Sequence, residues 1–247
     1  PLLILVRPWK GARSANKTYN WCYRHISFGG KALPNGFLSE SYLRIDILML
    51  AIFVSDEAVG IYSFAAMLIE GLYQVPVVFR TVINPILVTL LQARNTANLA
   101  RFCRRVMVAC IIVFTSCAIL ILVIFPFLEP YFPSNLISQA YPVLLILTFG
   151  LATYSAFIPL EFILMQGGQP GWQSTLMSWN IFINTGLNLI LVPNYGIDGA
   201  ALATAIAFAV SSLSLNFAVW WRLGLSGGFL LAETRLLKSL TSRAQGT

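Results

Sequence analysis

The chain has 247 residues, of which 57% are hydrophobic and only 10% are charged, with a net charge of +7 and a mean hydropathy of +0.76. Soluble domains carry about 25% charged residues, so this composition excludes an ordinary water-soluble domain and indicates a membrane protein. With one histidine, His25, the chain has little means for histidine-based acid–base or metal chemistry.

The first 35 residues divide into two parts. Residues 1–6 (PLLILV) look like the end of an apolar helix, so we expect the sequence to be a fragment that lacks an N-terminal part. Residues 7–35 are polar and carry six Lys or Arg residues, a pattern that can indicate binding to nucleic acid or anionic lipid. Between two membrane helices, it predicts a cytoplasmic loop, and we expect no nucleic-acid partner.

A membrane domain is predicted over residues 36–225, because it contains six long apolar segments joined by short connectors. Each segment is close to or above the roughly 20 residues that a helix needs to cross a bilayer. The six predicted spans are 36–54, 59–91, 103–127, 140–166, 171–192 and 199–221. Pro76 and Pro85 predict a bend in the second span.

The charges of the connectors predict the orientation of these spans. With six spans, 14 of the 16 basic residues fall on one side, while the connectors on the other side carry only acidic charges. The positive-inside rule then places both ends in the cytoplasm. Residues 226–247 mix apolar and basic side chains and are too short to span, so they predict a cytoplasmic tail that could lie on the membrane surface as a helix.

Three of the four cysteines, Cys103, Cys110 and Cys117, recur at intervals of seven residues within one span. This interval puts them on one helix face, about 10 Å apart along the axis, which is too far for a disulfide. We interpret them as small packing residues and not as a metal site.

Residues 179–209 predict a hairpin of two helices with a tight turn at 193–196 (PNYG). Asn180, Asn184 and Asn188 form a stripe on the first helix, and an amide exposed to hydrocarbon costs a few kcal/mol, roughly. The stripe is therefore expected to face protein. The second helix is rich in alanine, which allows a neighbouring helix to pack closely.

Five ionisable residues at membrane depth are candidates for function, since such groups are costly in a bilayer. Arg44 and Asp46 are two residues apart and so face different surfaces, which leaves Glu40 as one possible partner for Arg44. Arg44, in particular, would suit an anionic head group such as pyrophosphate. Arg80 and Glu161 either reach the membrane interface or line a cavity. The predicted substrate-binding residues are Arg44, Glu70, Arg80 and Glu161.

Four motifs in this order resemble the second lobe of polysaccharide and oligosaccharide-lipid flippases. They are RIDILML, SDEAVGIYSFA, VINPILVTLL and the hairpin NTGLNLILVPNYGIDGAALATAIAF, the last being the most specific. The flippases belong to the multidrug/oligosaccharidyl-lipid/polysaccharide exporter superfamily. The similarity covers residues 36–221.

The resemblance implies an all-α membrane protein whose six transmembrane helices form one lobe of a two-lobe, twelve-helix flippase. It implies movement of an undecaprenyl-pyrophosphate-linked oligosaccharide across the inner membrane of a bacterium by ion-coupled alternating access, for O-antigen or other polysaccharide synthesis. The expected partners are this lipid-linked substrate, membrane lipids and the missing N-terminal lobe.

A sodium site in this lobe of some relatives implies a further set of residues. The matching positions are Asp46, Asn184, Asn188, Ala200 and Thr204, where a hard cation would find carboxylate, amide, hydroxyl and carbonyl oxygens. Asn188 is an amide where that branch has a carboxylate. Na⁺ or H⁺ is thus the possible coupling ion, with no other cofactor expected. The alternative is a set of hydrogen bonds that only ties the helices together.

Three other functions remain open on the sequence. A drug or cation exporter of the same superfamily would use the acidic residues, although Arg44 and Arg80 argue against a cation cavity. A membrane-embedded polymerase or acyltransferase needs a reactive cluster on a large loop, and the connectors are short, so no enzyme activity is expected. An inert membrane scaffold would leave the buried charges unexplained.

Overall fold

The computed structural model describes residues 15–42, 44–93, 96–132 and 135–223. The predicted helix end at residues 1–6 and the predicted tail at 226–247 lie outside these residues. The described elements are α2 (Ala15–Tyr42), α3 (Ile45–Phe53), α4 (Asp56–Gln92), α5 (Thr96–Ile124), η2 (Phe125–Tyr131), α6 (Leu136–Ser155), η3 (Ile158–Leu160), α7 (Ile163–Gln166) and α8 (Pro170–Leu223).

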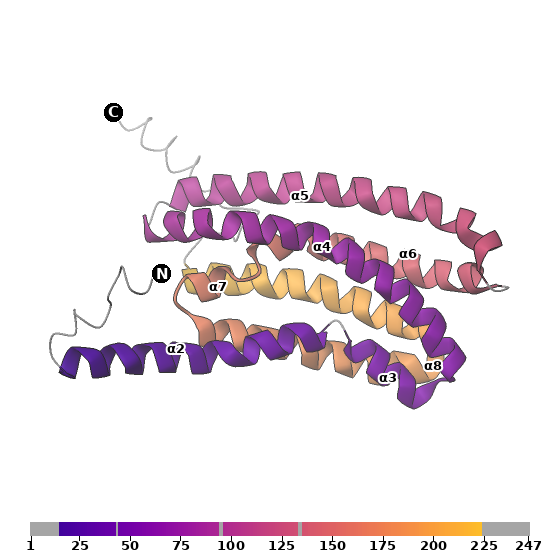
Figure 1. Cartoon of the computed structure of the whole chain (residues 1–247), viewed down its shortest axis with the longest axis horizontal. Helices are drawn as coiled ribbons and strands as arrows, with labels where there is room; N and C mark the ends of the chain where they lie inside the picture. Colours follow the sequence, from indigo (N-terminus) through magenta and orange to yellow (C-terminus); the bar gives the residue numbers. More distant parts are fainter. Residues whose placement is uncertain (1–14, 43, 94–95, 133–134, 224–247) are drawn as a thin grey trace, which may run out of the picture.

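The helices form an antiparallel bundle in which successive long helices run in opposite directions. In Figure 1, α5 lies along the top of the view and α2 and α3 lie along the bottom, with the C-terminal part of α8 (yellow) between them. The described part of the chain contains no β-strand. The predicted all-α fold is therefore confirmed.

Four helical stretches in the described residues are long and apolar enough to cross a membrane: Asp56–Gln92, Asn98–Tyr131, Leu136–Ser155 and Pro170–Arg222. The last stretch contains two of the predicted spans, because α8 doubles back on itself (Figure 1). Gly196 lies between its two limbs with φ +56° and ψ −131°, a conformation that favours glycine. The predicted hairpin and its tight turn are thus confirmed.

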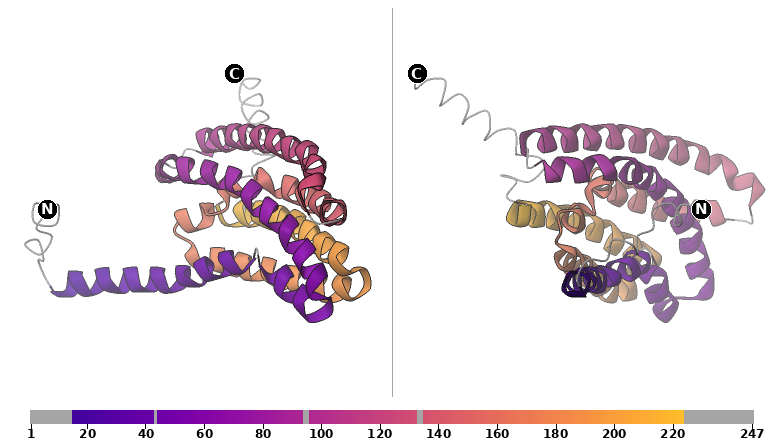
Figure 2. Two further views of the ribbon diagram at one scale, coloured as in Figure 1. Left: turned by 45° about the vertical axis from the view of Figure 1, so that its right-hand side comes forward. Right: turned by 60° about the vertical axis from the view of Figure 1, so that its left-hand side comes forward.

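The first predicted span differs most from the structure. Residues 36–54 are not one helix: α2 ends at Tyr42, and α3 begins at Ile45 after Arg44, whose φ of −121° and ψ of −4° are not helical. Residues 15–35, predicted as part of a loop, belong to α2, which in Figure 2 extends beyond the rest of the bundle. A hydrogen bond from Ser174 Oγ to the Lys31 carbonyl (2.7 Å) joins α2 to α8.

Local chemistry explains two other helix boundaries. Helix α4 begins three residues before the predicted span, because the Ala58 N–H donates to Ser55 Oγ and acidic side chains occupy the first turn. Helix α6 ends at Ser155, well before the predicted 166, and Pro159 follows within η3. In Figure 1, α4, which contains Pro76 and Pro85, is curved, as predicted.

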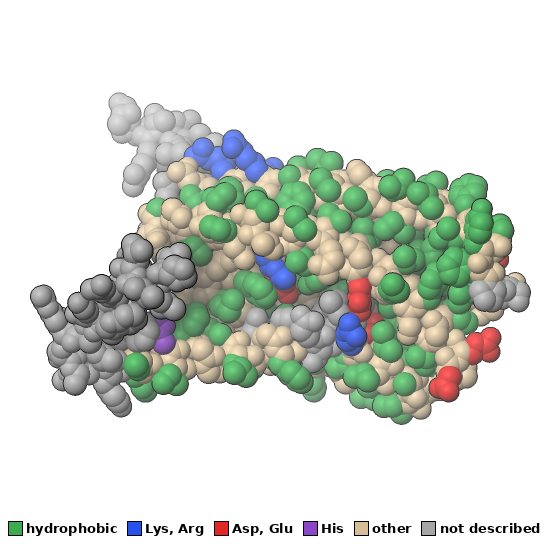
Figure 3. All heavy atoms as spheres, in the orientation of Figure 1, with side chains coloured by type: hydrophobic (Ala, Val, Ile, Leu, Met, Phe, Trp, Pro, Cys, Tyr) green, Lys and Arg blue, Asp and Glu red, His purple; other side chains and the backbone are tan. Residues whose placement is uncertain are grey.

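The core is built around α6, which packs against α4, α5 and α8. Its largest fully buried side chains include Tyr62, Phe114 and Phe208. Gly150 of α6 packs so closely on α8 that an added Cβ would lie 2.4 Å from the Cα of Ala205. The outer surface is rich in hydrophobic side chains (Figure 3), as a bilayer requires.

The prediction that the α5 cysteines are packing residues is confirmed for Cys103 and Cys110. Cys103 and Cys110 are fully buried and all four cysteines are free thiols. The Cys110 Sγ donates to the Ser155 carbonyl at 3.3 Å, which joins α5 to α6. Cys103 and Cys110 therefore act as small packing residues in the core.

Candidate functional site

A buried carboxyl group, Asp46, lies where α3, α4 and the second limb of α8 meet. Helix α3 supplies Asp46, which is 5% exposed, and its Oδ2 accepts hydrogen bonds from the Tyr62 hydroxyl of α4 and from Thr204 Oγ1 of α8 (3.3 Å). Its Oδ1 accepts from the Ile47 N–H at 2.9 Å. A buried carboxylate needs such donors, because burial without partners is costly. Three separate elements are thus tied together at one carboxyl group.

The asparagine pair of α8 lies at the same depth as this carboxyl group. A Cβ added to Gly199 would lie 2.3 Å from the Leu191 carbonyl oxygen, so these two residues face each other across the hairpin. Counting five residues along each limb from that contact places Thr204 level with the turn between Asn184 and Asn188. The structure therefore brings most of the predicted ion site to one depth.

Only some of the residues in the predicted ion site contact one another. Asn188 Nδ2 donates to the Asn184 carbonyl (2.9 Å) and to Asn184 Oδ1 (2.6 Å), and both residues are fully buried. Ala200 is also fully buried, one turn before Thr204. Among the described residues, no hydrogen bond joins Asp46 to either asparagine. The donor set, with carboxylate, hydroxyl and amide oxygens, fits a hard cation such as Na⁺.

The first charged pair is on an open face of the bundle. Arg44 lies 3.9 Å from Glu70 of α4, and the two side chains are 69% and 34% exposed. Arg44 and Asp46 do face different surfaces, as predicted. Glu40, considered as a partner for Arg44, has a side chain outside the described part of the chain.

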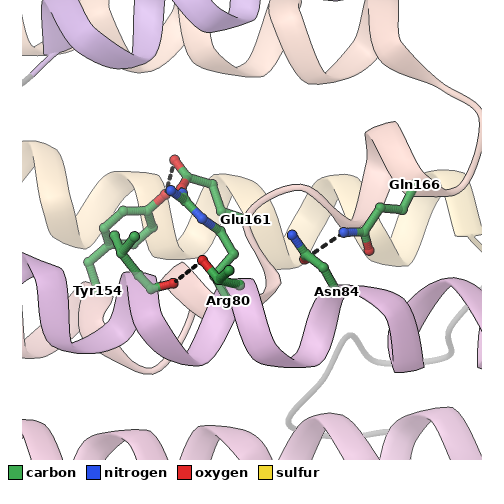
Figure 4. Close-up of polar contacts among 7 residues, drawn as sticks. Arg80, Asn84, Tyr154, Glu161 and Gln166 are labelled. Atoms are coloured by element: carbon green, nitrogen blue, oxygen red, sulfur yellow. Dashed lines mark hydrogen bonds and ion pairs between the residues drawn. The ribbon is translucent and has the colours of Figure 1, made fainter. Parts of the chain in front are cut away.

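The second charged pair is enclosed. Arg80 of α4 forms an ion pair with Glu161, which follows η3, and the side chains are 17% and 6% exposed. Tyr154 donates to the other carboxyl oxygen of Glu161 at 3.2 Å, and the Arg80 guanidinium lies 4.5 Å from the ring centre of Phe162. Figure 4 shows Arg80 and Tyr154 both pointing toward Glu161. Two of the four residues predicted to bind substrate, Arg80 and Glu161, therefore bind each other.

A polar contact beside this pair joins the same elements. Gln166 Nε2, at the end of α7, donates to Asn84 Oδ1 of α4 at 2.6 Å (Figure 4). Asn84 lies one turn beyond Arg80 on α4. Together, the two contacts anchor the irregular segment from η3 to α7 on α4.

Two tyrosines in these clusters were not predicted. Tyr62 and Tyr154 both donate their hydroxyl hydrogen to a buried carboxylate. The sequence did hold a signal, because a tyrosine within an apolar helix brings a hydroxyl group that needs a partner when it is buried. The identity of that partner depends on contacts between distant segments.

Charges at the two ends of the bundle have opposite signs. Asp56, Glu57 and Asp198 lie at the end where α4 begins and α8 turns, whereas the arginines at the start of α5 and the end of α8 lie at the opposite end. Figure 3 shows blue side chains at the upper left and red ones at the right. Arg222 there stacks on Trp172 and Trp221, with 3.7 and 4.9 Å between its guanidinium carbon and the ring centres.

Comparisons with known proteins reveal a likeness in fold. No protein-family model and no curated protein sequence matches the chain. A solved structure, described as the outward-facing conformation of a multidrug resistance MATE family transporter of the MOP superfamily, is similar with a TM-score of 0.64 and 17% identity. The match covers 82% of this chain and 45% of the transporter, so the chain spans less than half of that protein's length. The fold is therefore that of an all-α membrane protein, like part of a MATE transporter.

Proposed function

We propose that this chain is one lobe of a transporter that moves an undecaprenyl-pyrophosphate-linked oligosaccharide across the cytoplasmic membrane of a bacterium. The transporter would use ion-coupled alternating access and would make or break no covalent bond. Support comes from the fold that the chain shares with part of a MOP-superfamily transporter and from the motifs of the flippase branch. The second lobe, which faces this one in the proposal, would complete the cavity.

The observation that carries this proposal is the exposure of Arg44. Its side chain is 69% exposed, yet Arg44 lies nine residues before the end of α3, or about 14 Å from that end at 1.5 Å per residue. A charge at this depth is too costly to face lipid tails, so the open face belongs to a hydrated cavity. A guanidinium binds phosphate oxygens in pairs, which suits a pyrophosphate head group.

Glu70 has a defined part in this proposal. At 3.9 Å from Arg44, it holds the arginine in place before substrate arrives, and the pyrophosphate oxygens would replace it. Arg80 and Glu161 serve mainly to stabilise the cavity wall, because each neutralises the other. Asp46, Thr204 and the two asparagines would bind the coupling ion, Na⁺ or H⁺, away from the substrate surface.

The test uses the full-length protein in sealed liposomes with a fluorescent undecaprenyl-pyrophosphate oligosaccharide. Movement between leaflets is measured by the fraction of probe that dithionite cannot quench. Arg44→Ala should slow the movement roughly tenfold or more, because it removes a charge-assisted hydrogen bond to the phosphate. Arg44→Lys should retain part of the rate. Arg101→Ala, which removes an exposed arginine at the end of the bundle, is the matched control and should leave the rate unchanged.

A drug exporter of the same superfamily is the second candidate, since the similar structure is described as a multidrug resistance transporter. The exposed carboxylate of Glu70 would then bind an organic cation. In that case, Glu70→Gln would abolish ethidium efflux from the liposomes, and Arg44→Ala would increase it by removing a competing positive charge. Ethidium efflux without lipid movement would overturn the flippase proposal.

A further inference from the structure

A stripe of polar side chains is buried along the first limb of α8. Gln173, Asn180, Asn184 and Asn188 are 1%, 5%, 0% and 0% exposed. Their spacing of seven, four and four residues puts them on one face of the helix. At 1.5 Å per residue, this stripe extends over about 22 Å, most of the thickness of a bilayer core.

Each of these side chains keeps one polar atom without a hydrogen-bond partner in the described part of the chain. These atoms are Gln173 Oε1, Asn180 Oδ1, Asn184 Nδ2 and Asn188 Oδ1. An unpaired buried polar atom costs about 1–3 kcal/mol, so four in one stripe would severely destabilise a dry helix contact. Internal water typically satisfies such groups, with about three hydrogen bonds to each molecule.

The stripe leads from one end of the bundle to the depth of Asp46. Gln169, beside the start of α8, is half-buried and also has an unpartnered Oε1 atom. At the other end, Asn184 and Asn188 flank the level of Thr204, whose hydroxyl donates to Asp46. By the same count along the two limbs, Ser211 and Ser212 of the second limb, both buried, lie level with the interval between Gln173 and Asn180.

We propose that this polar stripe binds a file of internal water molecules that connects the Gln169 end of the bundle with the Asp46 carboxyl group. Besides the amide–amide bond of Asn184 and Asn188, these four side chains offer three unpartnered acceptors and one unpartnered donor, so water can bond to the stripe along its length. The ligand is water, and the small coupling cation would follow the same line of oxygen atoms. The role of this water file in ion coupling rests on the proposed function, whereas the presence of the water does not.

Met177 offers a direct test, because it lies within the stripe between Gln173 and Asn180. It is 5% exposed and is not part of the hydrophobic core cluster, whereas Met107 of α5 is 6% exposed and packs in that core. Pulsed X-rays generate hydroxyl radicals from internal water, and these radicals convert a nearby methionine to its sulfoxide. In full-length protein in lipid nanodiscs, Met177 should be oxidised roughly fivefold faster than Met107 or more, because bound water lies beside it.

Asn180→Leu supplies the second arm of the experiment. Leucine has a similar volume but no polar atom, so the oxidation rate of Met177 should fall to that of Met107. Equal rates for the two methionines in the unchanged protein would overturn the proposal, and this comparison needs no variant to fold. Fast Met177 oxidation in a protein that fails the lipid-movement assay would retain the water file and reject the proposed function. Lipid movement with slow Met177 oxidation would retain the proposed function and reject the water file.

Discussion

The two arginine–carboxylate pairs of this bundle have the same chemistry and opposite surroundings. Arg44 and Glu70 are 3.9 Å apart on an open face, whereas Arg80 and Glu161 are enclosed, with Tyr154 and Phe162 completing their contacts. An exposed pair contributes little to stability and remains available to a ligand, while a buried pair is costly to break. Their environment, and not their residue type, therefore separates a pair that is open to a ligand from a structural contact.

The largest expected effect comes from breaking the enclosed pair. Glu161→Leu leaves the Arg80 charge buried without a partner and should lower the free energy of unfolding by about 3–5 kcal/mol. The measurement is denaturant unfolding of the purified protein in mixed micelles. The double variant Arg80→Met with Glu161→Leu is the control and should recover most of the loss. A Glu161→Leu variant as stable as the unchanged protein would contradict the contrast between the pairs.

Tyr154→Phe tests the same carboxyl group through a smaller change in its contacts. It removes one hydrogen bond to Glu161 but keeps the ring, which stacks on Phe208 with 5.9 Å between ring centres. We expect a loss of about 1.5–3 kcal/mol in unfolding free energy, the range for a hydrogen bond to a charged group. Tyr195→Phe, at an exposed tyrosine, should change nothing and serves as the control. Equal effects at the two positions would count against a buried role for Glu161.

Asn84→Leu sharpens the comparison by removing a neutral contact beside the enclosed pair. It takes away the acceptor of the 2.6 Å hydrogen bond from Gln166, and the expected loss is about 0.5–1.5 kcal/mol. A second readout is proteolysis after Gln166, which should become faster because α7 is less firmly held on α4. Unchanged proteolysis would mean that the Arg80–Glu161 pair alone holds this segment.

The smallest stability effect is expected at the open pair. Glu70→Gln should change the free energy of unfolding by no more than about 1 kcal/mol, because the pair is solvated and its atoms are 3.9 Å apart. The same unfolding assay applies. A loss as large as that of Glu161→Leu would show that Arg44 and Glu70 hold the fold, and would remove the basis for assigning them to a ligand.

The sequence predicted those parts of the molecule that depend on local patterns. The apolar runs and the PNYG turn predicted the α8 hairpin, and the spacing of the cysteines predicted a buried face on α5. Helix α2 was missed because charge and hydropathy do not determine helicity, and its contact with Ser174 comes from a residue far along the chain.

The candidate site was predicted in its residues but not in its pairs. Glu161 and Arg80 are 81 residues apart, and no periodicity within α4 relates Arg80 to a residue beyond the end of α6. In the same way, Tyr62 reaches Asp46 only because a short connector folds α4 back on α3. Which polar side chains meet is decided by how the helices cross, which a pattern in one segment does not specify.

The glycine contact between α6 and α8 has a consequence for motion. Because Gly150 meets the backbone of Ala205 directly, no side chain separates the two helices at this point, and the stacked rings of Tyr154 and Phe208 join them nearby. The two helices should therefore move together as one rigid body in any opening and closing of the lobe. Bending would then concentrate at the joint between α2 and α3, where Arg44 already interrupts the helix, so that the arginine proposed to bind substrate would also lie at the pivot.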